Sequence, residues 1–265
     1  GKTTVLIHRI ANLMKYGRGS DSPEVPERVT EDDLRFLEEY AASGAGDRAR
    51  QEALCRLEPA APWTILAITF TNKAAKEMRE RIEKLAGARA EDIWVSTFHS
   101  GCAKILRRDI EKLGYTRSFT IYDDDDQMSA LKEILKKLNI DDKFLPPREI
   151  KGKISDAKNK LLGPQDWFSQ SERDYRSQLV YDVYQAYEEK LKSSNALDFD
   201  DLIVKTLELF AQHPPVLEAY QRKVRYIHVD EYQDTNYAQY MLVRLLAAQS
   251  RNLCVVGDDD QSIYG

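Results

Sequence analysis

The sequence has few cysteines and no long apolar run, and each scarcity excludes a class of protein. Its three cysteines, Cys55, Cys102 and Cys254, are scattered through 265 residues. An odd number without paired spacing fits neither a disulfide framework nor a zinc site, and it favours a reducing, cytoplasmic compartment. No apolar run approaches the roughly 18 residues that a membrane-spanning helix requires, so we expect no membrane partner.

The chain also lacks an excess of positive charge. It has 39 lysines and arginines against 44 aspartates and glutamates, which gives a net charge of −5. Domains that hold nucleic acid by bulk electrostatics are usually basic, so any contact with nucleic acid must be local. The first residue is not methionine and no leader-like segment follows it, so we expect the chain to be a piece of a longer protein.

Four short apolar segments, each followed by polar or helical sequence, indicate the fold class. They lie at 64–70, 93–98, 226–229 and 253–256. Strands that are apolar on both faces belong to buried parallel sheets, and the repeated strand-then-helix order predicts a doubly wound α/β domain. We expect this sheet domain to comprise residues 1–106 and 197–265.

The residues between the second and third strands have a different character. Amphipathic patterns at 127–138 and 178–192 predict an all-helical subdomain over 107–196, inserted into the sheet domain. The acidic run Asp123 to Asp126 fits either a metal site or a helix cap. We favour the cap, because carboxylates there meet free amides and the positive end of the helix dipole.

A polar stretch at 20–62 interrupts the first part of the sheet domain. Within it, Thr30 precedes three acidic residues, a pattern that predicts a capped helix start. Pro59 and Pro62 close the stretch. We interpret it as a small helical excursion rather than a domain.

The first three residues match the end of a phosphate-binding loop, G-x-x-x-x-G-K-[ST], and apolar spacing from Thr4 to Met14 predicts a helix after them. In such a loop the amides at the helix start hold phosphates, Lys2 reaches the β and γ oxygens, and the Thr3 hydroxyl binds Mg²⁺. An ordinary Gly-Lys-Thr at a helix start is the alternative, and three residues alone do not decide between them.

Two further strands end in polar residues that suit the same chemistry. Asp230 and Glu231 follow the third strand, at the sheet edge where open parallel sheets bind ligands. Asp230 could hold Mg²⁺, and Glu231 could deprotonate the water that attacks a γ-phosphate. After the fourth strand, Gln261 offers an uncharged side chain that can hydrogen-bond a γ-phosphate or its water.

Six motifs, taken together and in this order, resemble those of the superfamily 1 helicases of the UvrD/PcrA/Rep type. They occupy residues 1–3, 69–75, 97–100, 198–202, 229–236 and 257–264. The resemblance implies a RecA-like P-loop domain with a helical insertion, which is the first of two motor domains. It assigns nucleotide contacts to Gly1, Lys2, Thr3, Thr4 and Gln261, Mg²⁺ to Thr3 and Asp230, and catalysis to Glu231, Lys2 and Gln261.

The same resemblance implies a track for single-stranded DNA, formed by Phe70, Asn72, Lys73, Thr97, Phe98, His99 and Tyr264. Aromatic rings that stack on bases, together with polar groups that hold phosphates, bind single strands regardless of sequence. For Phe70 and Phe98 a place in the hydrophobic core is the alternative. Thr4 departs from many relatives, which have an arginine there that stacks on adenine, so the adenine contact is open.

The implied activity is ATP- and Mg²⁺-dependent translocation on single-stranded DNA, with 3′ to 5′ unwinding of duplex junctions. The second motor domain, with its arginine finger, would belong to the rest of the full-length chain. Two alternatives remain: the motor part of a helicase-nuclease of the AddA/RecB type, and a non-catalytic, nucleotide-dependent DNA clamp.

Overall fold

The computed structural model describes residues 1–18, 23, 25 and 27–258. Its α-helices are α1 (Lys2–Tyr16), α2 (Glu31–Ser43), α3 (Arg48–Leu54), α4 (Asn72–Ala86), α5 (Phe98–Asp109), α6 (Asp124–Lys137), α7 (Pro147–Asn159), α8 (Pro164–Gln170), α9 (Tyr175–Ser193), α10 (Asp201–Gln212), α11 (Pro214–Lys223) and α12 (Tyr237–Ala247). The strands are β1 (Ile65–Thr69), β2 (Trp94–Thr97), β3 (Thr120–Ile121), β4 (Ala196–Leu197), β5 (Tyr226–Val229) and β6 (Leu253–Val255). Short 3₁₀ helices occupy η1 (Pro62–Thr64), η2 (Ala88–Asp92), η3 (Ile110–Leu113) and η4 (Tyr232–Asp234).

The four predicted strands form one parallel sheet in the order β2-β1-β5-β6, which confirms the predicted fold class. In register, Leu66 of β1 lies opposite Trp94 of β2 and Ile227 of β5. Strand β2 pairs with one edge of β1, and β5 pairs with the other edge. The order of strands therefore switches between β1 and β5, the place where such sheets bind ligands beyond the strands' carboxyl ends.

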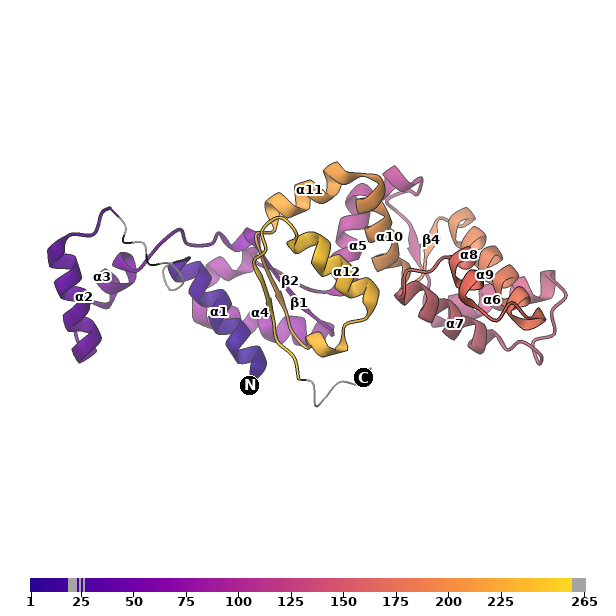
Figure 1. Ribbon diagram of the computed structural model, residues 1–265, viewed down its shortest axis with the longest axis horizontal. Helices are drawn as coiled ribbons and strands as arrows, with labels where there is room; N and C mark the ends of the chain where they lie inside the picture. The colour runs from indigo at the N-terminus through magenta and orange to yellow at the C-terminus, as the bar shows by residue number, and fades with distance from the viewer. Residues whose placement is uncertain (19–22, 24, 26, 259–265) are drawn as a thin grey trace.

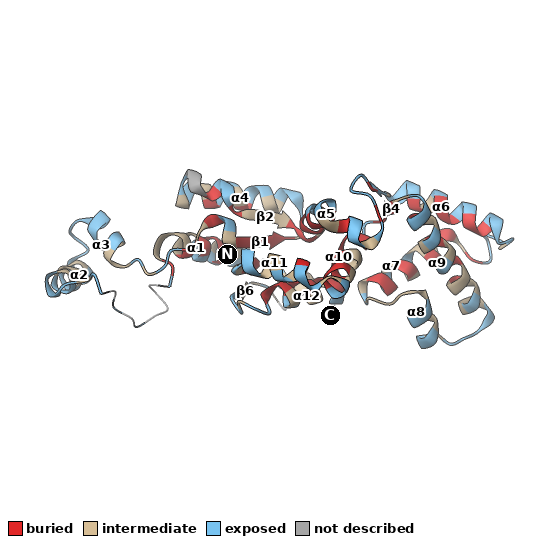
Figure 2. Cartoon of the chain, turned by 90° about the horizontal axis from the view of Figure 1, so that it is seen from above, coloured by how far each residue is buried: buried red, intermediate tan, exposed pale blue. Residues whose placement is uncertain are grey.

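Helices cover both faces of this sheet. Side chains alternate along β1, so neighbouring residues pack against different helices. Ile65 and Ala67 pack into a cluster with α1 and α4, whereas Leu66 and Ile68 pack into a larger cluster with α5, α10, α11 and α12. All of β1 is buried, and Figure 2 shows it as the red centre of the sheet domain. A strand that is apolar on both faces is thereby explained by a helical layer on each side.

The inserted helices have a hydrophobic core of their own, separate from the clusters beside the sheet. Helices α6, α7 and α9 supply it, with Leu131, Ile150 and Tyr187 among its buried residues, and α8 packs on α9. Figure 1 shows these four helices together at one end of the molecule. The helices predicted at 127–138 and 178–192 correspond to α6 and α9.

Two details differ from the predicted insertion. It is not all-helical, because β3 pairs in parallel with β4 where the chain enters and leaves it. Its start is also later than residue 107, since Ile110, Tyr115 and Phe119 pack in the cluster beside the sheet. We therefore take the insertion to begin at β3.

The cap interpretation of the acidic run is confirmed. Asp123 is the N-cap of α6, and its carboxylate accepts hydrogen bonds from the amides of Asp125 and Asp126. Asp126 completes a capping box by accepting from the Asp123 amide at 3.2 Å. Among the described residues, no group of histidine, cysteine, aspartate and glutamate side chains has the arrangement of a metal site.

The excursion forms helices α2 and α3, which extend from the other end of the molecule (Figure 1). Thr30 caps α2 in a capping box with Asp33, as predicted. Neither helix has a buried residue. In the described part of the chain, no helix combines the length and apolar character needed to cross a membrane.

Candidate functional site

The start of α1 and the end of β5 meet beside the switch point of the sheet. Gly1 is the N-cap of α1, without a side chain that could cap it. Thr3, in the first turn, donates its hydroxyl hydrogen to Asp230 Oδ2 at 2.8 Å, although 227 residues separate the two. The structure thus brings together the two residues predicted to hold Mg²⁺.

Asp230 lies where β5 leaves the sheet, with 5% of its surface exposed. Its amide donates to the Ile68 carbonyl of β1 at 3.0 Å, which fixes the backbone. Burial raises the pKa of the carboxyl, and the hydrogen bond from Thr3 opposes this. A carboxylate beside a hydroxyl is an oxygen donor set of the kind that Mg²⁺ prefers, so these residues fit the ion.

Lys2 points toward the end of β6. Its Nζ lies 2.8 Å from Asp258 Oδ2, and about half of its side chain is exposed (49%). An ammonium held by one partly exposed carboxylate can exchange that partner for a phosphate at modest cost, because ion pairs within reach of solvent contribute roughly 0 to 1 kcal/mol. The predicted phosphate ligand is therefore accessible.

Glu231 follows Asp230 in a left-handed backbone conformation, with φ of 52°. A non-glycine residue in this region is strained and commonly marks a functional site. The Glu231 amide donates to Asp230 Oδ1 at 3.1 Å, so the two carboxylates share one tight turn. The turn directs Glu231 away from the strand while Asp230 stays buried beside it.

Gln233 holds this turn against the end of β6, a role that our sequence reasoning missed. Its Nε2 donates to Glu231 Oε2 at 2.7 Å, and its Oε1 accepts from the Asp258 amide at 2.9 Å. A Cβ added to Gly257 would lie 2.7 Å from Gln233 Oε1, so a larger residue there would displace the Gln233 side chain. One amide side chain thus joins the predicted base to the segment that leads toward Gln261.

Three other predicted residues remain: Thr4, Gln261 and Tyr264. Thr4 Oγ1 accepts from Arg81 of α4 at 2.7 Å, and the adenine contact stays a prediction. Gln261 and Tyr264 lie outside the described residues.

The predicted DNA residues lie at the ends of β1 and β2 and at the starts of the helices that follow. Asn72 and Lys73 begin α4, and Asn72 Oδ1 accepts from Ser100 Oγ of α5 at 3.4 Å. Thr97 caps α5 by accepting from the Ser100 amide at 3.2 Å, and it is buried. The two motifs are therefore neighbours at the same sheet edge as Asp230.

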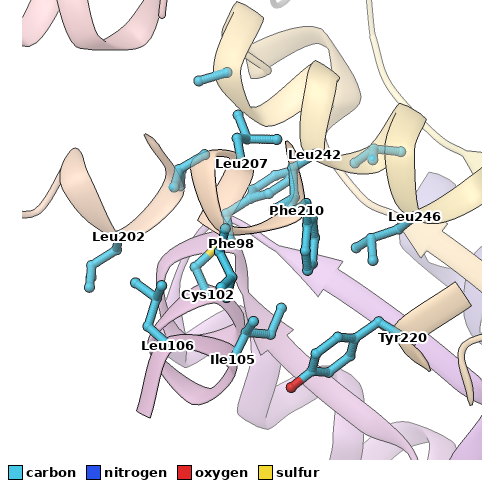
Figure 3. Packing of buried hydrophobic residues seen from close by; sticks show 14 of the residues in the cluster. Phe98, Cys102, Ile105, Leu106, Leu202, Leu207, Phe210, Tyr220, Leu242 and Leu246 are labelled. Carbon is cyan, nitrogen blue, oxygen red and sulfur yellow. The ribbon is translucent and has the colours of Figure 1, made fainter. Parts of the chain in front are cut away.

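Phe98 belongs to the hydrophobic core rather than to an open track. The residue is 2% exposed, and Figure 3 shows its ring among Cys102, Phe210 and Leu242. A ring that is covered on all sides has no face for a base, so the core alternative is favoured. Phe70 packs edge-on against Phe98, with centroids 5.5 Å apart, and is only partly buried.

His99 stacks on an aromatic residue that our reasoning left without a role. Its ring lies 3.9 Å from that of Phe199, at an angle of 23°, and Phe199 is 52% exposed. Burial lowers the pKa of His99 to about 4, so the ring is neutral at physiological pH. Phe199 stands in the fourth motif, where an aromatic residue between aspartates was the available signal.

Comparisons with known proteins show which family the chain belongs to. Residues 50–265 match the family model described as UvrD/REP helicase N-terminal domain. The chain is 60% identical over 204 residues to the ATP-dependent DNA helicase PcrA of Bacillus subtilis, a match that covers 77% of this chain and 28% of that protein. It is 58% identical over 205 residues to the protein of the same name from Staphylococcus aureus strain Mu50, with the same coverage. The chain thus spans about 28% of the relatives' length, and it belongs to the UvrD/REP helicase family.

Proposed function

We propose that this chain is the first motor domain of an ATP-dependent DNA helicase, which translocates along single-stranded DNA in the 3′ to 5′ direction. The observation that carries the proposal is the contact of Thr3 with Asp230, beside Lys2 and Glu231, at the sheet edge that also presents Phe70 and His99. A nucleotide site and a single-strand site on one edge can influence each other through short segments.

For the nucleotide, each residue has a distinct task. Lys2 would bind the β- and γ-phosphate oxygens, as the lysine of a phosphate-binding loop does. Mg²⁺, held by Thr3 and Asp230, would neutralise phosphate charge when bound. Glu231 would accept a proton from the attacking water, with its carboxylate oriented by Gln233.

For DNA, we propose a short aromatic surface made of Phe70, His99 and Phe199. Stacking on aromatic rings contributes about 1 to 3 kcal/mol per base and does not depend on sequence. Asn72 and Lys73 at the start of α4 would contact the phosphates. Thr97 and Phe98 would support this surface from within, as a helix cap and a core residue.

The rest of the motor is also part of the proposal. A second motor domain in the full-length chain would supply an arginine finger, which contributes on the order of 10³ to 10⁵ in kcat in phosphate-loop enzymes. We therefore expect the 265 residues alone to be almost inactive. Binding at duplex junctions and a cytoplasmic location stay predictions.

The test is translocation of the full-length protein on oligonucleotides that carry a fluorophore at one end. We expect ATP to drive the protein toward the 5′ end, so that the arrival signal is delayed in proportion to strand length. Arrival at the 3′ label would reverse the polarity. Binding without any length-dependent arrival would identify a clamp instead of a motor.

A further inference from the structure

Two aspartates of the fourth motif, residues 198–202, contact Lys158, a buried lysine that lies outside every motif. Lys158 is the penultimate residue of α7, and its side chain is 3% exposed. Its Nζ lies 2.7 Å from Asp198 Oδ2, 2.8 Å from Asp201 Oδ1 and 2.8 Å from Glu188 Oε1. The inserted helices thus place one cation among three carboxylates beside α10.

Electrostatics keep this lysine charged. Burial alone would lower the pKa of Lys158, but the carboxylates of Asp201, Asp198 and Glu188 raise it well above its ordinary range. Burial raises the pKa of Asp201, and Lys158 opposes that shift. Removing one partner from such a cluster leaves buried charge without compensation, so the geometry of the cluster is strongly determined.

The two aspartates also close the turn on which Phe199 stands. The Asp201 amide donates to Asp198 Oδ1 at 2.8 Å, and the Asp198 amide donates to Asp201 Oδ2 at 3.1 Å. Tyr187 of α9 donates its hydroxyl hydrogen to Asp198 Oδ2 at 3.2 Å. The exposed ring of Phe199, stacked on His99, therefore projects from a turn whose two ends are held by Lys158.

The next residue of α7 contacts the segment that follows Glu231. Asn159 Oδ1 accepts from Asn236 Nδ2 at 2.8 Å. Asn236 is the N-cap of α12, five residues after Glu231, and shares a capping box with Gln239. One end of α7 therefore contacts both the turn that carries Phe199 and the segment that follows the predicted base.

We propose that Lys158 is a positioning residue for single-stranded DNA: it fixes the 198–201 turn so that Phe199 and His99 form one stacking surface, and Asn159 connects this turn to the segment after Glu231. The inference rests on the proposed function, because it assigns a support to the DNA surface described there. A cluster that serves only as structural support would leave the affinity for DNA and its response to nucleotide unchanged in folded variants.

The first experiment is a double-mutant cycle in the full-length protein, with binding of a fluorescent oligo-dT strand as the readout. We expect Phe199→Ala to weaken binding roughly 5- to 150-fold, the range for one stacked base. Lys158→Met should weaken it to a similar extent, and the double variant should lose little more, because both changes remove the same surface. Lys160→Ala, at an exposed position two residues on, is the matched control.

Asp201→Asn guards against failure of Lys158→Met to fold, since it keeps the shape of the side chain and weakens the hold on Lys158. It should weaken oligo-dT binding and be non-additive with Phe199→Ala. Asn159→Ala should leave oligo-dT affinity without nucleotide unchanged but reduce the change in affinity that a non-hydrolysable ATP analogue causes.

The possible failures are distinguishable. If Phe199→Ala and Phe70→Ala both bind oligo-dT as wild type does, the proposed DNA surface itself is wrong. If those two variants bind weakly while folded Lys158→Met and Asp201→Asn bind normally, only the positioning role is overturned. Losses that add fully to that of Phe199→Ala would equally overturn it, because independent effects add. A full response to the nucleotide analogue in Asn159→Ala would remove the connection to the nucleotide side.

Discussion

Glu231, the proposed base, has surroundings that differ from those of the carboxylate before it. Its neighbour Asp230 is buried and bonded to Thr3, whereas Glu231 is turned out of the strand and accepts a hydrogen bond from Gln233. Two adjacent carboxylates thus have different surroundings, as expected if one binds the ion and the other accepts a proton. The difference comes from a single residue with positive φ.

Glu231→Gln should separate binding from hydrolysis. The amide keeps the size of the side chain but cannot take a proton, so we expect ATP and DNA binding to persist while kcat falls by roughly 10²- to 10⁴-fold. Nucleotide affinity by equilibrium titration and single-turnover hydrolysis are the measurements. A variant that fails to bind ATP would make Glu231 a ligand or a structural residue.

The buried His228 should make the free energy of unfolding depend on pH. It is buried in β5, and burial lowers its pKa to about 4. Below the unfolded value near 6.5, the unfolded chain takes up a proton that the folded chain does not, so stability falls as the pH falls from 6.5 toward 4. His228→Leu should remove up to about 2 kcal/mol of the loss between pH 7.5 and pH 5, at about 1.4 kcal/mol per pH unit.

Urea unfolding of the 265-residue chain at the two pH values measures this difference. Burial also lowers the pKa of His99, so part of the loss of stability on acidification should persist in the His228→Leu variant. If wild type and His228→Leu lose equal stability on acidification, the folded chain accommodates a protonated His228.

At the scale of elements, two phenylalanines in similar sequence contexts have different surroundings, one after the end of β1 and the other at the start of α5. Phe98 starts α5 and faces the core, whereas Phe70 follows β1 and covers Phe98 from the partly exposed side. We expect Phe98→Ala to cost roughly 3 to 5 kcal/mol of stability, as large core truncations do. Phe70→Ala should cost less stability and weaken single-strand affinity roughly 5- to 150-fold.

Thermal unfolding and oligo-dT binding, measured on both variants of the full-length protein, decide the assignment. A Phe70→Ala protein that is strongly destabilised, yet binds DNA normally when folded, would place Phe70 in the core as well.

The capping box at the start of α6 gives a second prediction at this scale. Asp123→Ala removes the acceptor for two amides and should cost about 1 kcal/mol of stability. The Mg²⁺ dependence of ATP hydrolysis should not change, because the carboxylates of this run act on the helix. A shift in the Mg²⁺ concentration needed for half-maximal hydrolysis would revive the metal interpretation.

Local sequence patterns predicted a helix or strand well where that element is specified by its own residues. The apolar runs at 64–70 and 226–229 form strands of the sheet, and Thr30 and Asp123 cap helices, because an apolar run and a capping residue can both be recognised from neighbouring residues in the sequence. Gln233 and Lys158 were missed because their partners are distant in the chain: Asp258 lies 25 residues from Gln233, and Asp198 lies 40 residues from Lys158. The two-residue strands β3 and β4 were missed for the same reason, since each forms only by pairing with the other.

For the whole molecule, three parts are arranged in a row: the exposed helices α2 and α3, the sheet domain, and the inserted helices (Figure 1). The described residues of the proposed nucleotide and DNA sites lie in the central part, and α7 of the insertion contacts the segments beside them through Lys158 and Asn159. The chain therefore presents one edge of one sheet as its chemical surface, and the proposed motor requires that both ligands act there together.

Steady-state ATP hydrolysis by the full-length protein, with and without single-stranded DNA, tests that claim most directly. We predict that oligo-dT stimulates hydrolysis strongly in the wild-type protein and that Lys2→Ala abolishes the stimulated rate, because Lys2 is the cation that the phosphate-loop motif assigns to the β- and γ-phosphates. Lys84→Ala, which removes a charge from the last turn of α4, should retain the stimulation. Hydrolysis that ignores DNA, or that survives Lys2→Ala undiminished, would contradict the account.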